Sequence, residues 1–227
     1  MERKIFISVL GLSCLALAIG ILGPTELTKS PVETEKHLPW NISLVDGTTQ
    51  VFGLKLGQST MEDGLQGLKA SAEVSMFVSE DDDHVVEAFF NDVNMMGLGA
   101  KIVLTADVSE DEMRAMYKRG LRIATMGSGT RKVTLSAEDL LRVRQAPIAS
   151  ITYLPKIHLE EDLVQKRFGQ PSQRIKEKQG DAVHWLYPEL GLDVTLSEKE
   201  KDVLQYLPPA NFSTLLLPLK RDGEVQD

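Results

Sequence analysis

Residues Glu160 to Leu196 read EEDLVQKRFGQPSQRIKEKQGDAVHWLYPELGLDVTL, and this stretch decides the fold that the sequence predicts. It begins as a short helix, which the run Phe168-Gly169-Gln170-Pro171 closes, because proline cannot continue a helix. Strands follow, separated by a turn at Gln179-Gly180-Asp181 and by a second turn that ends at Gly191. The stretch therefore predicts one helix packed on an antiparallel sheet.

A weaker copy of this pattern lies between Leu56 and Val108. It has a helix first and strands next, and Gly97-Leu98 opens an alternating strand as Gly191-Leu192 does in the second copy. One helix on three strands buries too little surface alone, whereas two units side by side share a core. We therefore expect an α+β fold built of tandem helix-plus-antiparallel-sheet units. The expected boundaries are a first unit over residues 40–147 with an extra hairpin and helix, a second unit over 148–219, and a polar tail over 220–227.

Local signals place several turns and helix starts. Asp46-Gly47 predicts a hairpin turn, because this pair favours the tight turns between antiparallel strands. Capping boxes predict helices that begin at Ser59, Ser109 and Ser136, each with an acidic residue three positions later. Short glycine-containing or acidic runs, such as Asp81 to Asp83, are expected as hairpin turns.

The N-terminus predicts a membrane segment. Residues Ile5 to Gly23 contain no charged side chain, and a helix of that length spans roughly 28 Å, about the thickness of a bilayer core. Arg3 and Lys4 favour leaving the amino end in the cytoplasm. We expect a transmembrane signal anchor over 1–23, a linker over 24–39, and a single-pass protein of the bacterial inner membrane with its body in the periplasm. A cleaved signal peptide and a lipoprotein signal ending at Cys14 are the alternatives.

Composition narrows the function classes. The net charge of -8 is unsuited to phosphate backbones, so no nucleic-acid partner is expected. Cys14 is the single cysteine, so the body has neither disulfide nor thiol chemistry. His158 with Glu160 to Asp162 is interpreted as a helix N-terminus and not as an acid/base cluster. The sequence predicts no metal site, no cofactor and no catalytic residue.

Three motifs in the second copy resemble a known family. They are Phe168-Gly169-x-Pro171, Trp185-x-Tyr187 and Gly191-Leu192-x-Val194, and they are similar to the BamE (SmpA/OmlA) family, small lipoproteins of the outer-membrane β-barrel assembly machine. A tandem of such units is also similar to the β-lactamase inhibitor protein architecture. The resemblance implies the fold and a role in envelope protein–protein contacts, and it implies no catalytic residue. Because Cys14 is badly placed for a lipid anchor, membership of the assembly machine is not carried over.

These observations lead to a functional prediction. We expect a non-enzymatic, membrane-anchored periplasmic protein that contacts another protein of the cell envelope. Trp185 and Tyr187 are the predicted contact residues, because such rings act as anchors at interfaces. Met95 and Met96 are predicted to form an exposed patch in a loop. The alternative is a periplasmic module that binds a small ligand or lipid in a cleft between the two units.

Overall fold

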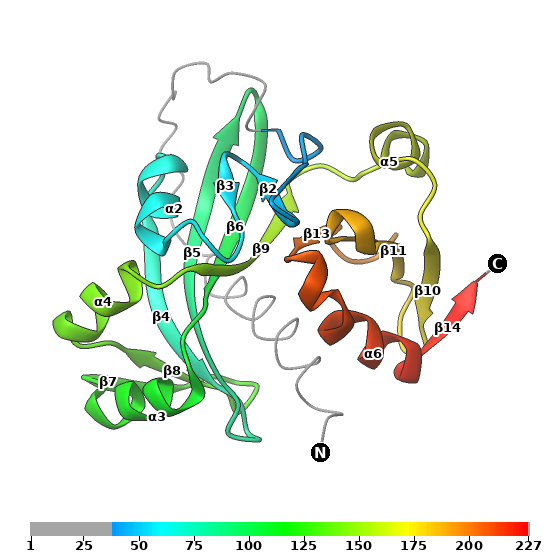
Figure 1. The fold of residues 1–227 in the computed structure, drawn as a ribbon. Helices are drawn as coiled ribbons and strands as arrows, with labels where there is room; N and C mark the ends of the chain where they lie inside the picture. The colour runs from blue at the N-terminus through cyan, green and yellow to red at the C-terminus, as the bar shows by residue number, and fades with distance from the viewer. Residues whose placement is uncertain (1–37, 227) are drawn as a thin grey trace.

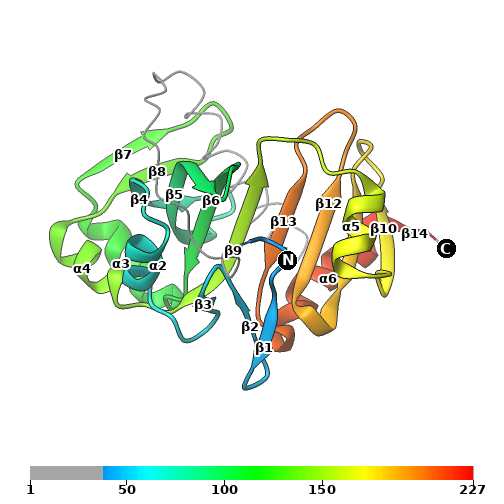
Figure 2. The same cartoon turned by 90° about the horizontal axis from the view of Figure 1, so that it is seen from above.

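One large antiparallel sheet dominates the computed structural model, which describes residues 38–226 (Figure 1). Its strands are β4 (Ala72–Val78), β5 (His84–Met95), β6 (Leu98–Ala106), β7 (Arg122–Thr125), β8 (Arg131–Thr134), β9 (Ile148–Pro155), β10 (Gln173–Glu177), β11 (Val183–Tyr187), β12 (Leu192–Leu196), β13 (Val203–Tyr206) and β14 (Gly223–Gln226). Their order across the sheet is β14-β10-β11-β12-β13-β9-β6-β5-β4-β8-β7. Figure 2 shows β7 and β8 at one end of the sheet and β10 and β14 at the other.

A second, small sheet precedes the large one. It consists of β1 (Ser43–Val45), β2 (Thr48–Val51) and β3 (Leu54–Lys55). Asp46 and Gly47 both have positive φ angles, 51° and 77°, as the tight turn between β1 and β2 requires, so the predicted hairpin turn is confirmed. Thr49 ties this sheet to the large one, because its hydroxyl donates to the carbonyls of Leu190 and Leu207 at 2.8 and 3.0 Å.

The helices are short and begin at side-chain caps in three cases. Ser109 and Ser136 cap α3 (Glu110–Arg119) and α4 (Ala137–Arg144), as the sequence predicted. Thr60, and not Ser59, caps α2 (Met61–Gly67), in a capping box with Asp63. The remaining elements are α5 (Glu161–Phe168), α6 (Phe212–Asp222) and the 3₁₀ turns η4 (Pro188–Leu190) and η5 (Pro209–Asn211).

The two faces of the large sheet pack against different elements. One face forms the main core with the small sheet and with residues of α2, α3, α4 and α5. On the other face, α6 packs on the outer strands through Phe212, Leu215 and Leu219. Alternation along β11 shows the division, because Trp185 lies in the main core and Leu186 lies against α6.

The expected fold class is wrong. The described residues are 41% strand and 26% helix, and their main feature is one large antiparallel sheet where an α+β fold with tandem helix-plus-sheet units was expected. β9 pairs with β6 on one side and with β13 on the other, so the sheet runs through the expected boundary at residue 147 without interruption. The C-terminal residues expected as a polar tail form the end of α6 and strand β14, which pairs with β10.

The predicted transmembrane helix and inner-membrane location also require correction. The longest helix between residues 38 and 226 is α6, and its 11 residues span only about 17 Å. Within these residues no helix has the length and apolar character needed to cross a bilayer. The segment that led to the prediction, residues 1–23, lies outside the described residues, as does the linker up to residue 37.

Candidate functional site

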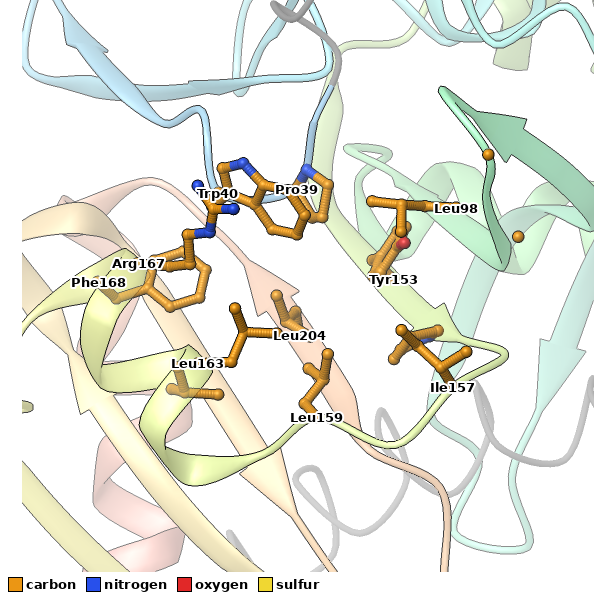
Figure 3. A pocket seen from close by; sticks show the side chains of 14 residues that line it. Pro39, Trp40, Leu98, Tyr153, Ile157, Leu159, Leu163, Arg167, Phe168 and Leu204 are labelled. Carbon is orange, nitrogen blue, oxygen red and sulfur yellow. The ribbon is translucent and has the colours of Figure 1, made fainter.

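An apolar pocket lies where the ends of β6, β9 and β13 meet α5 (Figure 3). Its volume is about 110 Å³. It is bounded by the N-terminal end of the described chain, the β5–β6 turn, β9 with the segment after it, α5 and β13. The lining residues are Pro39, Trp40, Gly97, Leu98, Gly99, Tyr153, Pro155, Ile157, Leu159, Leu163, Val164, Arg167, Phe168 and Leu204.

Two buried polar contacts fix the walls of this pocket. The carboxylate of Asp202, which is 2% exposed, accepts a 2.6 Å hydrogen bond from the backbone N–H of Leu159. Its Oδ2 also lies 2.9 Å from Nδ1 of His158, so the segment between β9 and α5 is held against the start of β13. On the opposite wall, the hydroxyl of Tyr206 donates to the carbonyl of Pro39 at 2.8 Å. The pocket is therefore held in place by β13 from both sides.

Arg167 and Trp40 form the polar edge of the pocket. The guanidinium of Arg167 lies over the Trp40 ring, 4.3 Å from its centroid, which is a cation–π geometry. Figure 3 shows the two side chains stacked at the mouth, away from Ile157. Ile157 is 58% exposed and stands on the other side of the opening. The mouth thus combines one exposed aliphatic side chain with one cation held on an aromatic ring.

The chemistry of the lining favours binding over catalysis. Tyr153 and Arg167 are the only lining residues with ionisable side chains. Burial raises the pKa of Tyr153 to about 12, so its hydroxyl stays protonated at neutral pH. A permanently charged guanidinium and a protonated phenol provide no general base. What the pocket offers a ligand is apolar surface.

The predicted aromatic contact residues lie in the core. Trp185 is 1% exposed and Tyr187 is 5% exposed. The guanidinium of Arg174 covers the Trp185 ring at 3.7 Å. Tyr187 donates to the carbonyl of Gly169 at 3.0 Å, and its ring lies 5.8 Å from that of Phe168, which lines the pocket. Tyr187 therefore supports the pocket wall from behind, and neither ring is available at the surface.

The two methionines of the predicted patch have different surroundings. Met95 is the last residue of β5 and is 7% exposed, so it belongs to the core. Met96 is 42% exposed in the β5–β6 turn, with a positive φ of 53°, and it immediately precedes the pocket residue Gly97. Only Met96 is therefore placed where a bound partner could touch it.

A buried ion cluster lies on the sheet face opposite the main core. His184, which is fully buried, has its Nδ1 2.7 Å from Asp193 Oδ2 and its Nε2 3.1 Å from Glu177 Oε1. Thr195 Oγ1 lies 3.1 Å from the same Nδ1. Trp185, the next residue in the chain, lies on the other face in the main core. The sequence contained no signal for this cluster, because its members come from three strands.

The residues that line the pocket were not predicted, although the alternative prediction placed a ligand-binding cleft between the two expected units, and the lining includes residues of both. Its lining comes from segments that are far apart in the chain, and no spacing between them repeats. The lining residue that stands out most in the sequence is Trp40, because the chain contains two tryptophans.

The acidic turn at Asp81 to Asp83 forms ion pairs with Arg114 and Arg131 through Asp82. Between residues 38 and 226 no group of three metal-ligating side chains is found.

Comparisons with known proteins give no relative for this chain: no family model matches it, and neither do the curated proteins or the solved structures. The resemblance to the BamE family therefore stays a prediction.

Proposed function

We propose that this chain is a non-enzymatic binding protein whose pocket takes up one large apolar side chain of a partner protein. The observation that supports the proposal most directly is the size of the pocket, about 110 Å³ with an apolar lining. A cavity of roughly 150 Å³ holds a molecule the size of benzene. Pockets for drug-sized ligands measure about 300–1,000 Å³, which disfavours a whole lipid or cofactor.

The arrangement of the mouth supports a protein partner. Binding hot spots are commonly large side chains that enter a desolvated pocket and are surrounded by contacts that exclude water. Trp40 and Ile157 line the opening and provide such a rim, and the exposed Met96 precedes the lining residue Gly97 in the chain. A partner that inserts a Leu, Met or Phe side chain would bury this rim at the same time.

The proposal is tested with capped amino acids as probes. N-acetyl-phenylalaninamide, N-acetyl-leucinamide and N-acetyl-lysinamide are titrated into methyl-labelled protein and followed by NMR. We expect the methyl signals of Leu98, Ile157 and Leu204 to shift with the first two probes and not with the third. Laurate serves as the lipid probe. Saturable binding of laurate with no response to the capped amino acids would favour the small-ligand alternative and contradict the proposal.

A pair of matched variants locates the binding. Ile157→Asp places a charge at the mouth, and Leu217→Asp places the same charge on α6, where Leu217 is 66% exposed. We expect Ile157→Asp to weaken binding of the apolar probes at least tenfold and Leu217→Asp to leave it unchanged. Equal effects of the two variants would show that the probes bind elsewhere.

A further inference from the structure

Two buried side chains on adjacent strands, one of them a member of the His184 ion cluster, each carry an acceptor oxygen without a hydrogen-bond partner in the described part of the chain. Asp193 on β12 and Gln205 on β13 are directly opposite each other, so their side chains share one sheet face with Cβ atoms about 4.5–5.5 Å apart. Asp193 is 1% exposed and Gln205 is 7% exposed. Within the described residues, neither Asp193 Oδ1 nor Gln205 Oε1 has a hydrogen-bond partner.

Such a pair of oxygens requires a donor. An acceptor that is buried without a partner costs about 1–3 kcal/mol, and native proteins leave few of them. The other oxygen of Asp193, Oδ2, is already taken by His184. Because the two residues are directly opposite each other on one sheet face, a single donor placed between them would satisfy both oxygens.

The charges around the pair decide which kind of donor fits. His184 lies between the carboxylates of Asp193 and Glu177, which raise its pKa to about 10, so one positive charge faces two carboxylates. Thr152, which is opposite Gln205 on β9, and Thr195 add only hydroxyl groups. A neutral or cationic donor is therefore accepted, and an anion is excluded.

We propose that Asp193 Oδ1 and Gln205 Oε1 form a binding site for a small hydrogen-bond donor that bridges the two oxygens. The donor has two or more hydrogens and the size of one heavy atom, which describes both a water molecule and an ammonium ion. The site is separate from the apolar pocket and does not depend on the function proposed for it.

The first test is a crystal structure of the full chain at about 1.5 Å resolution, grown without ammonium salts and then soaked in ammonium chloride. We expect one density peak within hydrogen-bond distance, about 2.7–3.2 Å, of both oxygens. An empty space, with the Gln205 amide turned so that its NH₂ donates to Asp193, would overturn the proposal.

A second measurement tells the two donors apart. The Tm is recorded in ammonium chloride and in tetramethylammonium chloride at equal ionic strength, because the methylated ion has no N–H to donate. A higher Tm in ammonium alone, together with the peak, assigns the site to a cation. The peak with equal Tm values assigns it to water.

Variants tie the peak to these two oxygens. Gln205→Met removes one acceptor, keeps the length of the side chain and disturbs no ion pair, so we expect it to lose the peak and any ammonium effect. Gln173→Met, on the same face of β10, is the matched control and should keep both. If Gln205→Met does not fold, Gln205→Leu replaces it, since it also removes the acceptor and leaves the ion pairs intact, and it should lose the ammonium effect. A peak that persists on Asp193 alone in Gln205→Met would contradict a site shared by two oxygens.

Discussion

At the scale of single residues, His184 is a fully buried ionisable group that contacts two carboxylates. Its complete burial would by itself lower its pKa, since a charged ring loses its hydration. The carboxylates of Asp193 and Glu177 outweigh that effect and raise the pKa to about 10. His184 is therefore charged at neutral pH, and its charge helps to hold β10, β11 and β12 together.

This pKa predicts how stability depends on pH. The folded value of about 10 lies above the unfolded value of 6.5, so the stabilisation from His184 is fully present below pH 6.5 and is lost as the pH rises toward 10. We expect its contribution to the free energy of unfolding to be on the order of a few kcal/mol. Urea denaturation at a series of pH values measures it.

The variant His184→Gln isolates this contribution. It leaves Asp193 buried without its cation, so we expect a loss of about 3–5 kcal/mol near pH 6, and the difference from wild type should shrink toward pH 10. His158→Gln is the control, because the His158 side chain is 57% exposed and should contribute about 1 kcal/mol or less. A difference between His184→Gln and wild type that stays constant with pH would contradict the assignment.

At the scale of elements, the small sheet meets the residues that follow η4 and β13 in a close contact between segments distant in the chain. Gly191, which ends η4, has a positive φ of 63°, and a Cβ atom there would overlap the carbonyl oxygen of Leu207 and the hydroxyl of Thr49. The hydroxyl of Thr49 donates to Leu190 and Leu207 across this contact. Glycine is therefore required at position 191 by space as well as by backbone conformation.

A pair of glycine substitutions separates these two requirements. Gly47 also has a positive φ, 77°, but nothing lies within 4 Å of a Cβ atom there. We expect Gly47→Ala to cost about 1 kcal/mol for the backbone alone, and Gly191→Ala to cost about 2–4 kcal/mol because overpacking is added. Thermal unfolding of both variants measures the difference. Equal losses of stability in the two variants would show that the contact around Gly191 admits a methyl group at no additional cost.

The elements also show what the sequence could predict. Turn pairs such as Asp46-Gly47 and caps such as Ser109 act within a few residues, and they located hairpins and helix starts correctly. The helix predicted to begin at Ser59 is instead capped by Thr60, because a second residue suited to the N-cap lies one position further along the chain. Strand β14 was missed because it is four residues long and mostly exposed, so no alternating apolar pattern marks it, and its pairing with β10 joins segments distant in the chain.

At the scale of the whole molecule, a single core joins both expected units. The main cluster contains buried residues from Val51 near the start of the described chain to Tyr206 near its end. β9 pairs with a strand from each unit. Sequence periodicity reports the two sheet faces of a strand but not which strand lies beside it, so neither the continuous sheet nor the pocket that it frames could be read from the chain.

A shared core predicts cooperative unfolding. We expect one calorimetric transition, with calorimetric and van't Hoff enthalpies that agree, although the chain is longer than most two-state domains. A core variant in the first half, Met61→Ala, and Gly191→Ala in the second should lower the Tm of this same transition. Two separate transitions, each shifted by only one of the variants, would show that the halves fold independently.

The hydroxyl of Thr49 bonds to a carbonyl that is 158 residues further along the chain. The pocket has the same property, since Pro39 and Trp40 face Leu204 across it. Contacts between residues so far apart in the chain form late in folding. During synthesis the amino-terminal residues emerge first, and they cannot make these contacts until β13 has also emerged. A nascent chain that ends before Leu204 therefore lacks one wall of the pocket, so the pocket can form only after β13 has been translated.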